Sequence, residues 1–232
     1  MTAEPLADIE TALIPEGYFT MGDDAHRPDE RPAHRVWSSA FRMALRPVTN
    51  QEYAGFLTAT GHEPPRFWED LSFNAPEQPV VGVSWLDADA YCRWLGSVTG
   101  HAVRLPTEAE REKASRGGLE HALFPWGDDP GEGDGRFQQD APRPAGLSAP
   151  NGYGLFDIGY NIHEWCADWY DRDYYKTSPE CDPQGPSSGT RRASRGGAWR
   201  HQIKVCRCSA RSSLDPTFRY NDYGFRVAVD AV

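Results

Sequence analysis

Apolar residues recur at helical spacing in three stretches of the first half of the chain. The first is capped by Thr49 or Asn50 and ends at Gly61. The second is capped by Ser84, the third by Thr107, and an acidic residue follows each of these two caps three positions later. One stripe of the second stretch is apolar: Trp85, Ala88, Cys92 and Leu95. We therefore predict three helices, of which the third ends at Gly117-Gly118.

Alternation of polar and apolar residues, which is typical of strands, occurs near both ends of the chain. Gly17–Gly22 predicts a strand and a turn, and after an acidic loop an extended run follows from His34 to Val48. Val205–Arg211 alternates strictly and predicts a further strand. Its two faces would carry Arg207, Ser209 and Arg211 on one side, and Cys206, Cys208 and Ala210 on the other.

The middle of the chain predicts little regular structure. Residues 136–194 hold many Pro, Gly, Asp and Ser between short aromatic runs, and a compact domain with so much irregular backbone needs another support, such as a metal ion. The order of strands, helices, then loops and strands predicts an α+β fold. We expect residues 1–13 to form a polar lead-in and residues 14–232 to form a single domain.

Charge and cysteine content narrow the classes of function. The net charge of −10 argues against nucleic acid or an anionic membrane as a partner. No apolar run is long enough to span a bilayer, and the N-terminus lacks a signal sequence. Five cysteines cannot all pair in disulfides, so we expect a cytoplasmic protein.

Nine motifs carry a resemblance to the formylglycine-generating enzyme, or sulfatase-modifying factor, family. They occur in this order: Ile14–Gly22, Pro47–Tyr53, Val83–Tyr91, Arg104–Glu110, Pro125–Gly127, Asn151–Asp157, Asn161–Trp169, Arg195–Gly197 and Gly224–Arg226. The resemblance covers the chain from Ile14 to Val227. It implies an elaborated C-type-lectin-like fold with low regular secondary structure and bound calcium.

The resemblance also implies an oxidative activity, although this chain departs from the family pattern. Members that make formylglycine oxidise a substrate cysteine with O₂ and hold Cu(I) between two cysteine thiolates five residues apart. Counted from Gly197, those positions fall here on His201 and Cys206. Ala198 replaces the serine that usually follows the two glycines. We expect His201 and Cys206 to form an altered catalytic site for copper or iron, because nitrogen and sulfur ligands suit either metal.

Each further candidate has a structural alternative. Cys206 and Cys208 are either metal-ligand candidates or small core residues. By resemblance, the Glu164 carboxylate and backbone oxygens bind calcium, and the alternative is a salt bridge of Glu164 within the loop. The backbone oxygens belong to Gly159, Tyr160 and Ile162. The motif His163-Glu164-x-x-Ala167 lacks the second histidine of a zinc protease.

Candidate substrate contacts come from the same resemblance and from charge. Trp165 resembles the aromatic residue beside the substrate cysteine, and Asp222 lies where these enzymes often carry Asn. Arg207, Arg211 and Arg219 are candidates for a rim that binds acids, or for ordinary ion pairs.

Two functions of different class remain. The first is an O₂-dependent oxidoreductase of the formylglycine-generating type with a His-x4-Cys metal site; a family oxidase that works without the cysteine pair is a separate, lesser option. The second is a non-catalytic member that binds a peptide, protein or small ligand in the lectin-like cleft. Cys206 is the residue on which the first depends.

Overall fold

The structure is a computed structural model that describes residues 10–131 and 139–231. The helices are α1 (Asn50–Thr60), α2 (Trp85–Thr99) and α3 (Glu108–Arg116), with single 3₁₀ turns at Pro28–Glu30 (η1), Tyr174–Lys176 (η2) and Ile203–Val205 (η3). The strands are β1 (Thr11–Ile14), β2 (Gly17–Met21), β3 (His34–Ser38), β4 (Phe41–Ala44), β5 (Val103–Arg104), β6 (His163–Trp169), β7 (Arg192–Arg195), β8 (Arg211–Leu214), β9 (Tyr223–Gly224) and β10 (Ala228–Asp230).

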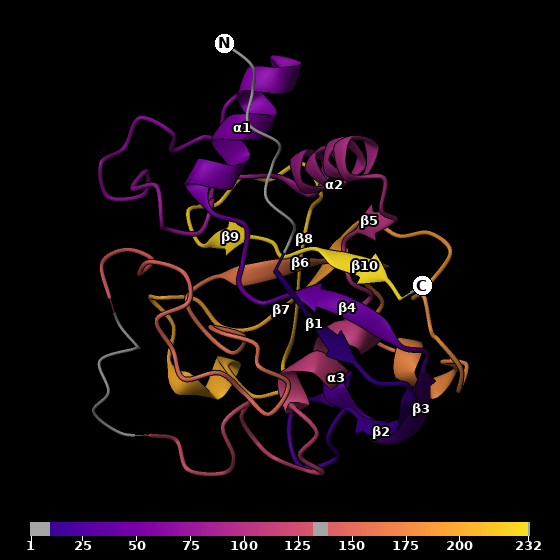
Figure 1. The fold of residues 1–232 in the computed structure, drawn as a ribbon. Helices are drawn as coiled ribbons and strands as arrows, with labels where there is room; N and C mark the ends of the chain where they lie inside the picture. Colours follow the sequence, from indigo (N-terminus) through magenta and orange to yellow (C-terminus); the bar gives the residue numbers. More distant parts are fainter. Residues whose placement is uncertain (1–9, 132–138, 232) are drawn as a thin grey trace.

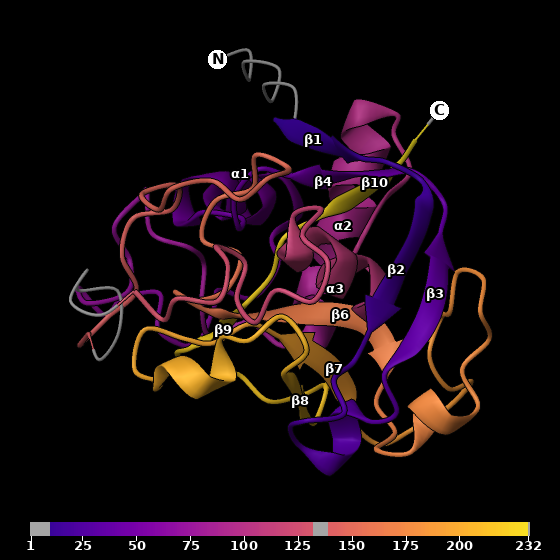
Figure 2. The same cartoon turned by 90° about the horizontal axis from the view of Figure 1, so that it is seen from below.

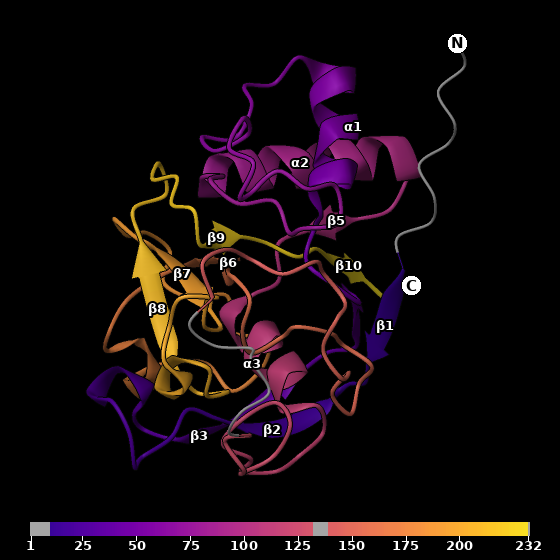
Figure 3. The same ribbon diagram turned by 90° about the vertical axis from the view of Figure 1, so that its left-hand side faces the viewer.

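The strands form three small sheets with helices above and below them (Figure 1). One sheet has the order β1-β4-β10-β5, a second the order β8-β7-β6-β9, and β2 pairs with β3 alone. Helices α1 and α2 lie above the strands, and α3 lies lower, between β6 and the β2–β3 pair, an arrangement that Figure 3 shows from another side. The largest apolar cluster joins α1 and α2 to the sheets through residues such as Tyr53, Tyr91 and Phe225.

The three predicted helices are present, and their caps are the reason. Thr49, Ser84 and Thr107 each accept a hydrogen bond from the backbone three residues on, while the acidic side chain at that position binds back to the cap. The helices end at Gly61, Gly100 and Gly117, all in the left-handed conformation that glycine adopts at little cost.

Three expectations about strands need correction. β1 begins at Thr11, inside the predicted lead-in, and pairs with β4; residues 1–9 of that lead-in lie outside the described part. β6 was not predicted, because both of its faces are buried and its sequence therefore lacks alternation. The predicted strand Val205–Arg211 does not form: the chain makes η3 and turns there, and β8 begins only at Arg211.

Buried ion pairs hold the irregular part of the chain together, in the place where the sequence suggested a metal ion. Glu108 at the start of α3 binds Arg195 of β7 and Arg211 of β8 at 2.8–2.9 Å. All three side chains are nearly inaccessible to solvent. Burial alone would raise the pKa of Glu108, but the two guanidinium groups lower it, so the carboxylate stays charged.

A second buried carboxylate ties the N-terminal third to the C-terminal third. Glu30 of η1 accepts two hydrogen bonds from Arg207, at 2.5 and 2.6 Å, and one from Ser209 at 2.8 Å. The η1 turn therefore packs against the segment that precedes β8, and Figure 2 shows it beside β7 and β8. These contacts bring together the segments that line a pocket.

Candidate metal centre and pocket

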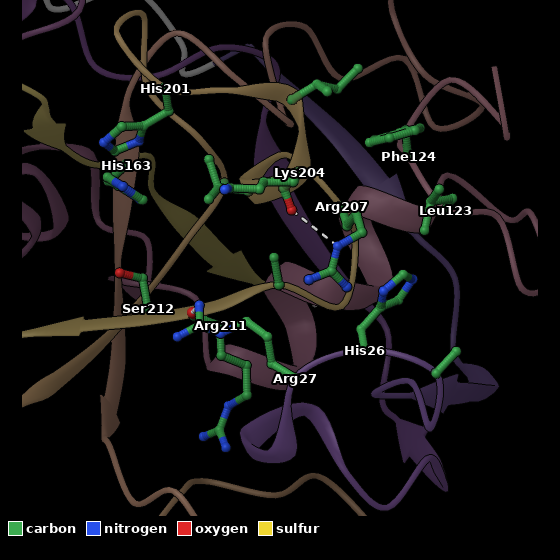
Figure 4. A pocket seen from close by; sticks show the side chains of 15 residues that line it. His26, Arg27, Leu123, Phe124, His163, His201, Lys204, Arg207, Arg211 and Ser212 are labelled. Atoms are coloured by element: carbon green, nitrogen blue, oxygen red, sulfur yellow. Dashed lines mark hydrogen bonds between the residues drawn. The ribbon is translucent and has the colours of Figure 1, made fainter. Parts of the chain in front are cut away.

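A pocket of about 800 Å³ lies between the segment that contains η1 and the residues around η3. Its walls come from chain regions far apart in sequence, including Ala25–Arg27, Leu123-Phe124 and Ile203–Val205. Figure 4 shows two imidazoles, those of His163 and His201, together at one end of it. Leu123, Phe124 and His26 lie toward the other end. Pockets of this volume hold small organic molecules.

His163, His201 and Asp222 form a group with the ligand types of a metal site. One ligand atom of each lies within 4.8 Å of those of the other two. His163 opens β6, and Asp222 immediately precedes β9, which pairs with β6 in parallel. The backbone nitrogen of His163 donates to the Asp222 carbonyl at 2.8 Å, so the sheet itself fixes two of the three residues.

Two buried atoms of this group have no hydrogen-bond partner among the described residues. They are Nδ1 of His163 and Oδ1 of Asp222. A buried polar atom without a partner costs on the order of 1–3 kcal/mol, and a bound ion or water is the usual explanation for one. His163 also has a hydrogen bond with the backbone of Gly196, which by elimination involves Nε2 and leaves the lone pair on Nδ1. Burial, followed by the nearby charges of His201 and Arg200, lowers the pKa of His163 to about 3, so the ring is neutral.

The other two members are held by neighbours that can move. Arg200 donates to Oδ2 of Asp222 from Nε at 2.9 Å and from Nη2 at 2.8 Å, and its side chain is 45% exposed. His201 is half-buried; its Nδ1 accepts a long hydrogen bond of 3.3 Å from the Ala198 backbone, and its Nε2 lies 3.6 Å from Oδ2 of Asp222. The His201 ring also contacts that of His163, with centroids 4.8 Å apart.

Cys206 is not a member of this group, which corrects the predicted His201–Cys206 site. Its side chain is 0% exposed and packs in an apolar cluster with Phe124 and Tyr160. An enclosed thiol leaves no open position for a substrate, because apolar packing surrounds it. The structure therefore joins His201 to His163 and Asp222 instead. Cys208 is also buried, and none of the described cysteines is in a disulfide.

The packing of Cys206 against the two-glycine motif gives a testable result. A Cβ added at Gly197 would lie 2.5 Å from Sγ of Cys206 and 3.2 Å from Val205. We expect Gly197→Ala to lower the free energy of unfolding by about 1–3 kcal/mol through overpacking, and Cys206→Ala in the same chain to recover part of that loss. Chemical denaturation of the two single variants and the double variant measures this coupling.

Gly55→Ala is the matched control for that experiment. Gly55 lies within α1, and its added Cβ would meet only Trp94, at 3.9 Å. There we expect a gain of up to about 1 kcal/mol from helix propensity. Equal losses in Gly197→Ala with and without Cys206 would contradict the proposed clash.

The candidate arginines are ion-paired, which was the alternative to an acid-binding rim. Arg207 and Arg211 line the pocket, but their guanidinium groups bind Glu30 and Glu108 from behind. Arg219 pairs with Asp87 at 2.9 Å, away from the pocket lining. These inward pairs differ from the predicted arrangement, in which Arg207 and Arg211 share one face of a strand; the chain forms η3 and turns there instead.

Trp165 lies in the core, and the predicted substrate contact is therefore wrong. Its side chain is 0% exposed and belongs to the largest apolar cluster. Its Nε1 donates to the Val83 carbonyl at 3.1 Å, which satisfies its polar atom inside the protein.

The calcium expectation at Glu164 is also corrected. Both carboxylate oxygens accept hydrogen bonds from buried guanidinium groups, at 2.8 Å from Arg111 and at 2.9 and 3.0 Å from Arg226. A calcium ion would have to displace two buried cations from this carboxylate. The Gly159 carbonyl, another proposed ligand, accepts from the backbone of Gly197 at 3.0 Å. The salt-bridge alternative describes Glu164.

Sequence reasoning missed His163 as a member of this group. The motif around it was tested only for a zinc protease, whose ligands lie four residues apart on a helix. Here the three residues are separated by 38 and 21 positions, as the numbers 163, 201 and 222 show, and only the fold brings them together. The position of His163 inside the family motif Asn161–Trp169 was an available signal.

Fold and site together define a class: an α+β chain with little regular structure, whose pocket ends at two imidazoles beside a buried carboxylate. The sulfatase-modifying factor enzyme 1-like domain model matches residues 2–231. The formylglycine-generating enzyme of Streptomyces coelicolor is 34% identical, with 99% of this chain and 92% of that protein covered. The chain therefore belongs to the sulfatase-modifying factor, or formylglycine-generating enzyme, family.

Other relatives share only a domain with this chain. The serine/threonine-protein kinase pkn1 of Chlamydia caviae is 33% identical over 94% of this chain, which spans only 38% of that protein. The hercynine oxygenase of Mycolicibacterium smegmatis is 31% identical over 95% of this chain and 61% of its own length.

Solved structures confirm the fold. PvdO from Pseudomonas aeruginosa matches with a TM-score of 0.84 and 28% identity, covering 95% of this chain and 94% of PvdO. Variable protein 1 of Treponema denticola also matches with a TM-score of 0.84, at 24% identity and 95% coverage of each chain. The α+β, formylglycine-generating-enzyme fold predicted from the sequence is thus confirmed. Across the described residues, no helix has the length and apolar character that crossing a bilayer requires.

Proposed function

We propose that this chain is an O₂-dependent oxygenase or oxidase of its family that binds iron(II) through His163, His201 and Asp222. The observation that carries the proposal is the pair of buried ligand atoms without partners, Nδ1 of His163 and Oδ1 of Asp222, beside a pocket. Two imidazoles and one carboxylate with open positions are typical of non-haem iron(II) oxygenases. The relative named hercynine oxygenase supports oxidative chemistry over a purely hydrolytic role.

The chain's own residues would prepare this site in two ways. The hydrogen bond between His163 and Gly196, together with the Tyr223 ring 4.8 Å away, holds the imidazole with its lone pair toward the group. Arg200 neutralises Asp222 and, being half exposed, can withdraw when a cation arrives. Ligation through Nε2 of His201 requires its ring proton on Nδ1, at the expense of the long hydrogen bond from Ala198. Iron held there supplies the activation of O₂ for a substrate in the pocket.

The test is an anaerobic titration of the metal-free chain with iron(II), followed by anomalous scattering from crystals of the loaded protein. We expect one equivalent of iron, located between His163, His201 and Asp222. Iron-loaded protein freed of excess metal is expected to take up O₂ with ascorbate as reductant. A zinc-loaded sample is the control, because zinc accepts the same ligands but has no redox chemistry. Iron found elsewhere, or no iron at all, would overturn the proposal.

The second candidate is a non-catalytic member that binds a ligand in the pocket. It is favoured by one observation: Cys206, the only cysteine left at the two family positions, is enclosed in apolar packing. This function predicts ligand binding that is independent of metal. Failure of the iron titration, together with ligand binding by the metal-free chain, would select it.

A further inference from the structure

The pocket has an unusual charge for a protein that carries a net charge of −10. Among the described residues that line it there is no aspartate or glutamate, while Arg27, Lys204, Arg207 and Arg211 all contribute. A basic pocket in an acidic molecule favours an anionic organic ligand over a cationic one.

Only part of that positive charge is available to a ligand. Arg207 and Arg211 are buried in bidentate pairs with Glu30 and Glu108, so their charges are already balanced. Lys204 is exposed at the pocket, and no acidic side chain of the described residues lies within ion-pair distance of it. Arg27 is 58% exposed, and its Nε lies 3.6 Å from Oδ1 of its partner Asp29, which is longer than a hydrogen bond. Lys204 therefore carries the free charge among the four lining cations.

The position of Lys204 is fixed by the buried pairs behind it. Its backbone carbonyl accepts a hydrogen bond of 3.0 Å from Nε of Arg207, whose other nitrogens bind Glu30. In Figure 4, Lys204 stands between the two imidazoles at one end of the pocket and Arg207. A ligand anion on this lysine is therefore close to the His163–His201 end.

A large part of the remaining wall is apolar. Leu123, Phe124, Ile203 and Val205 line the pocket, and the Phe124 ring stacks on that of Trp126 with centroids 5.2 Å apart. An apolar wall of branched and aromatic side chains gains free energy by covering an apolar body, at roughly 25 cal/mol per Å² buried. Charge and wall together require a ligand with one anionic end and one apolar end.

We propose that this pocket binds a small carboxylate with an apolar, ring-bearing body, whose carboxylate pairs with Lys204. The body lies on Leu123, Phe124, Ile203 and Val205. The role of this ligand as the substrate of the metal site rests on the proposed function. The ligand class itself rests on the pocket alone.

The test uses three compounds that differ in one group: 3-phenylpropionate, 3-phenylpropan-1-ol and 3-phenylpropylamine. Their dissociation constants are measured with the metal-free full chain by calorimetry. We expect the carboxylate to bind most tightly and the amine least, with the carboxylate weakened by raising the salt from 0.05 to 0.5 M and the alcohol unaffected. Lys204→Gln is expected to weaken the carboxylate about tenfold, and the alcohol less than twofold.

Lys176→Gln is the matched control, because Lys176 is an exposed lysine outside the pocket lining, paired with Asp173 at 2.6 Å. It is expected to leave all three affinities unchanged. Equal binding of carboxylate and alcohol, tighter binding of the amine, or no effect of Lys204→Gln would each overturn the inference. Because the titrations contain no metal, a failed iron titration with a successful carboxylate series removes the oxygenase and keeps the ligand class. The reverse pair of results removes only the ligand class.

Discussion

Replacing Glu164 with glutamine is expected to lower the free energy of unfolding by about 3–5 kcal/mol. The substitution leaves Arg111 and Arg226 buried with no carboxylate between them, and both guanidinium groups are almost wholly shielded from solvent. A chain of this size loses about 2–4 °C of Tm per kcal/mol, so thermal unfolding shows the effect clearly. The same measurement in urea gives the free energy directly.

The dependence on pH identifies the cause of that loss. Burial by itself would raise the pKa of Glu164, but Arg111 and Arg226 bring it below its ordinary value of 4.5. A folded-state pKa below the unfolded one means stabilisation that is present above about pH 4.5 and is lost as the pH falls through the folded pKa. The gap between wild type and Glu164→Gln should therefore narrow in acid.

Glu180→Gln is the control for Glu164→Gln, since Glu180 is 53% exposed and lies 3.9 Å from Arg35. A change of no more than about 0.5 kcal/mol is expected there. Adding a calcium chelator should leave the Tm of the wild type where it was. A chelator that lowers the wild-type Tm but not that of Glu164→Gln would show that calcium does bind this carboxylate.

Removing one imidazole of the metal group is expected to weaken iron(II) binding by about 100-fold or more, since changes to outer partners alone cost 10–100-fold. His201→Ala is the sharper variant because His201 is half-buried on a loop and contributes little to the core. His163→Ala should have the same effect on affinity with an added loss of stability, since His163 is buried against Tyr223. Anaerobic calorimetry measures the affinity, and circular dichroism checks the fold.

Two further variants distinguish the His163–His201–Asp222 site from metal sites that would use His26 or Cys206. His26 lines the same pocket outside the group of three, so His26→Ala should leave iron affinity unchanged. Cys206→Ala should also leave it unchanged, because its thiol lies in the apolar cluster. If Cys206→Ala abolishes metal binding while His163→Ala does not, the thiolate site predicted from the sequence is the correct one.

The sequence predicted those elements whose determinants are local. Thr49, Ser84 and Thr107 specify helix starts through hydrogen bonds that span three residues, and glycines end the same helices, so all three helices were found. The nine motifs, in their order along the chain, were sufficient to predict the family, and the family implied the fold. β6 could not be predicted, because a strand that is buried on both faces does not alternate between polar and apolar residues.

The candidate site was predicted only in part, because its determinants are distant in sequence. The alternating pattern predicted that Arg207 and Arg211 lie on one face of a strand. Both side chains point into the protein instead, because Arg207 pairs with Glu30, 177 residues away, and Arg211 pairs with Glu108, 103 residues away. His201 lines the pocket, while the sequence analysis sought its partner five residues on, at Cys206, instead of at His163 and Asp222. Asp222 was assigned to substrate contact, a role that stays a prediction beside its proposed part in metal binding.

The ion pair between Glu30 and Arg207 means that the pocket exists only once the whole chain has folded. One wall of the pocket comes from the first thirty residues and the opposite one from the last forty, and that buried pair joins them. During synthesis on the ribosome, no binding-competent species can exist until the C-terminal segment has emerged and docked. Ligand binding in this pocket would therefore report complete folding, and fragments that lack either end should not bind a ligand there even where their remaining helices form.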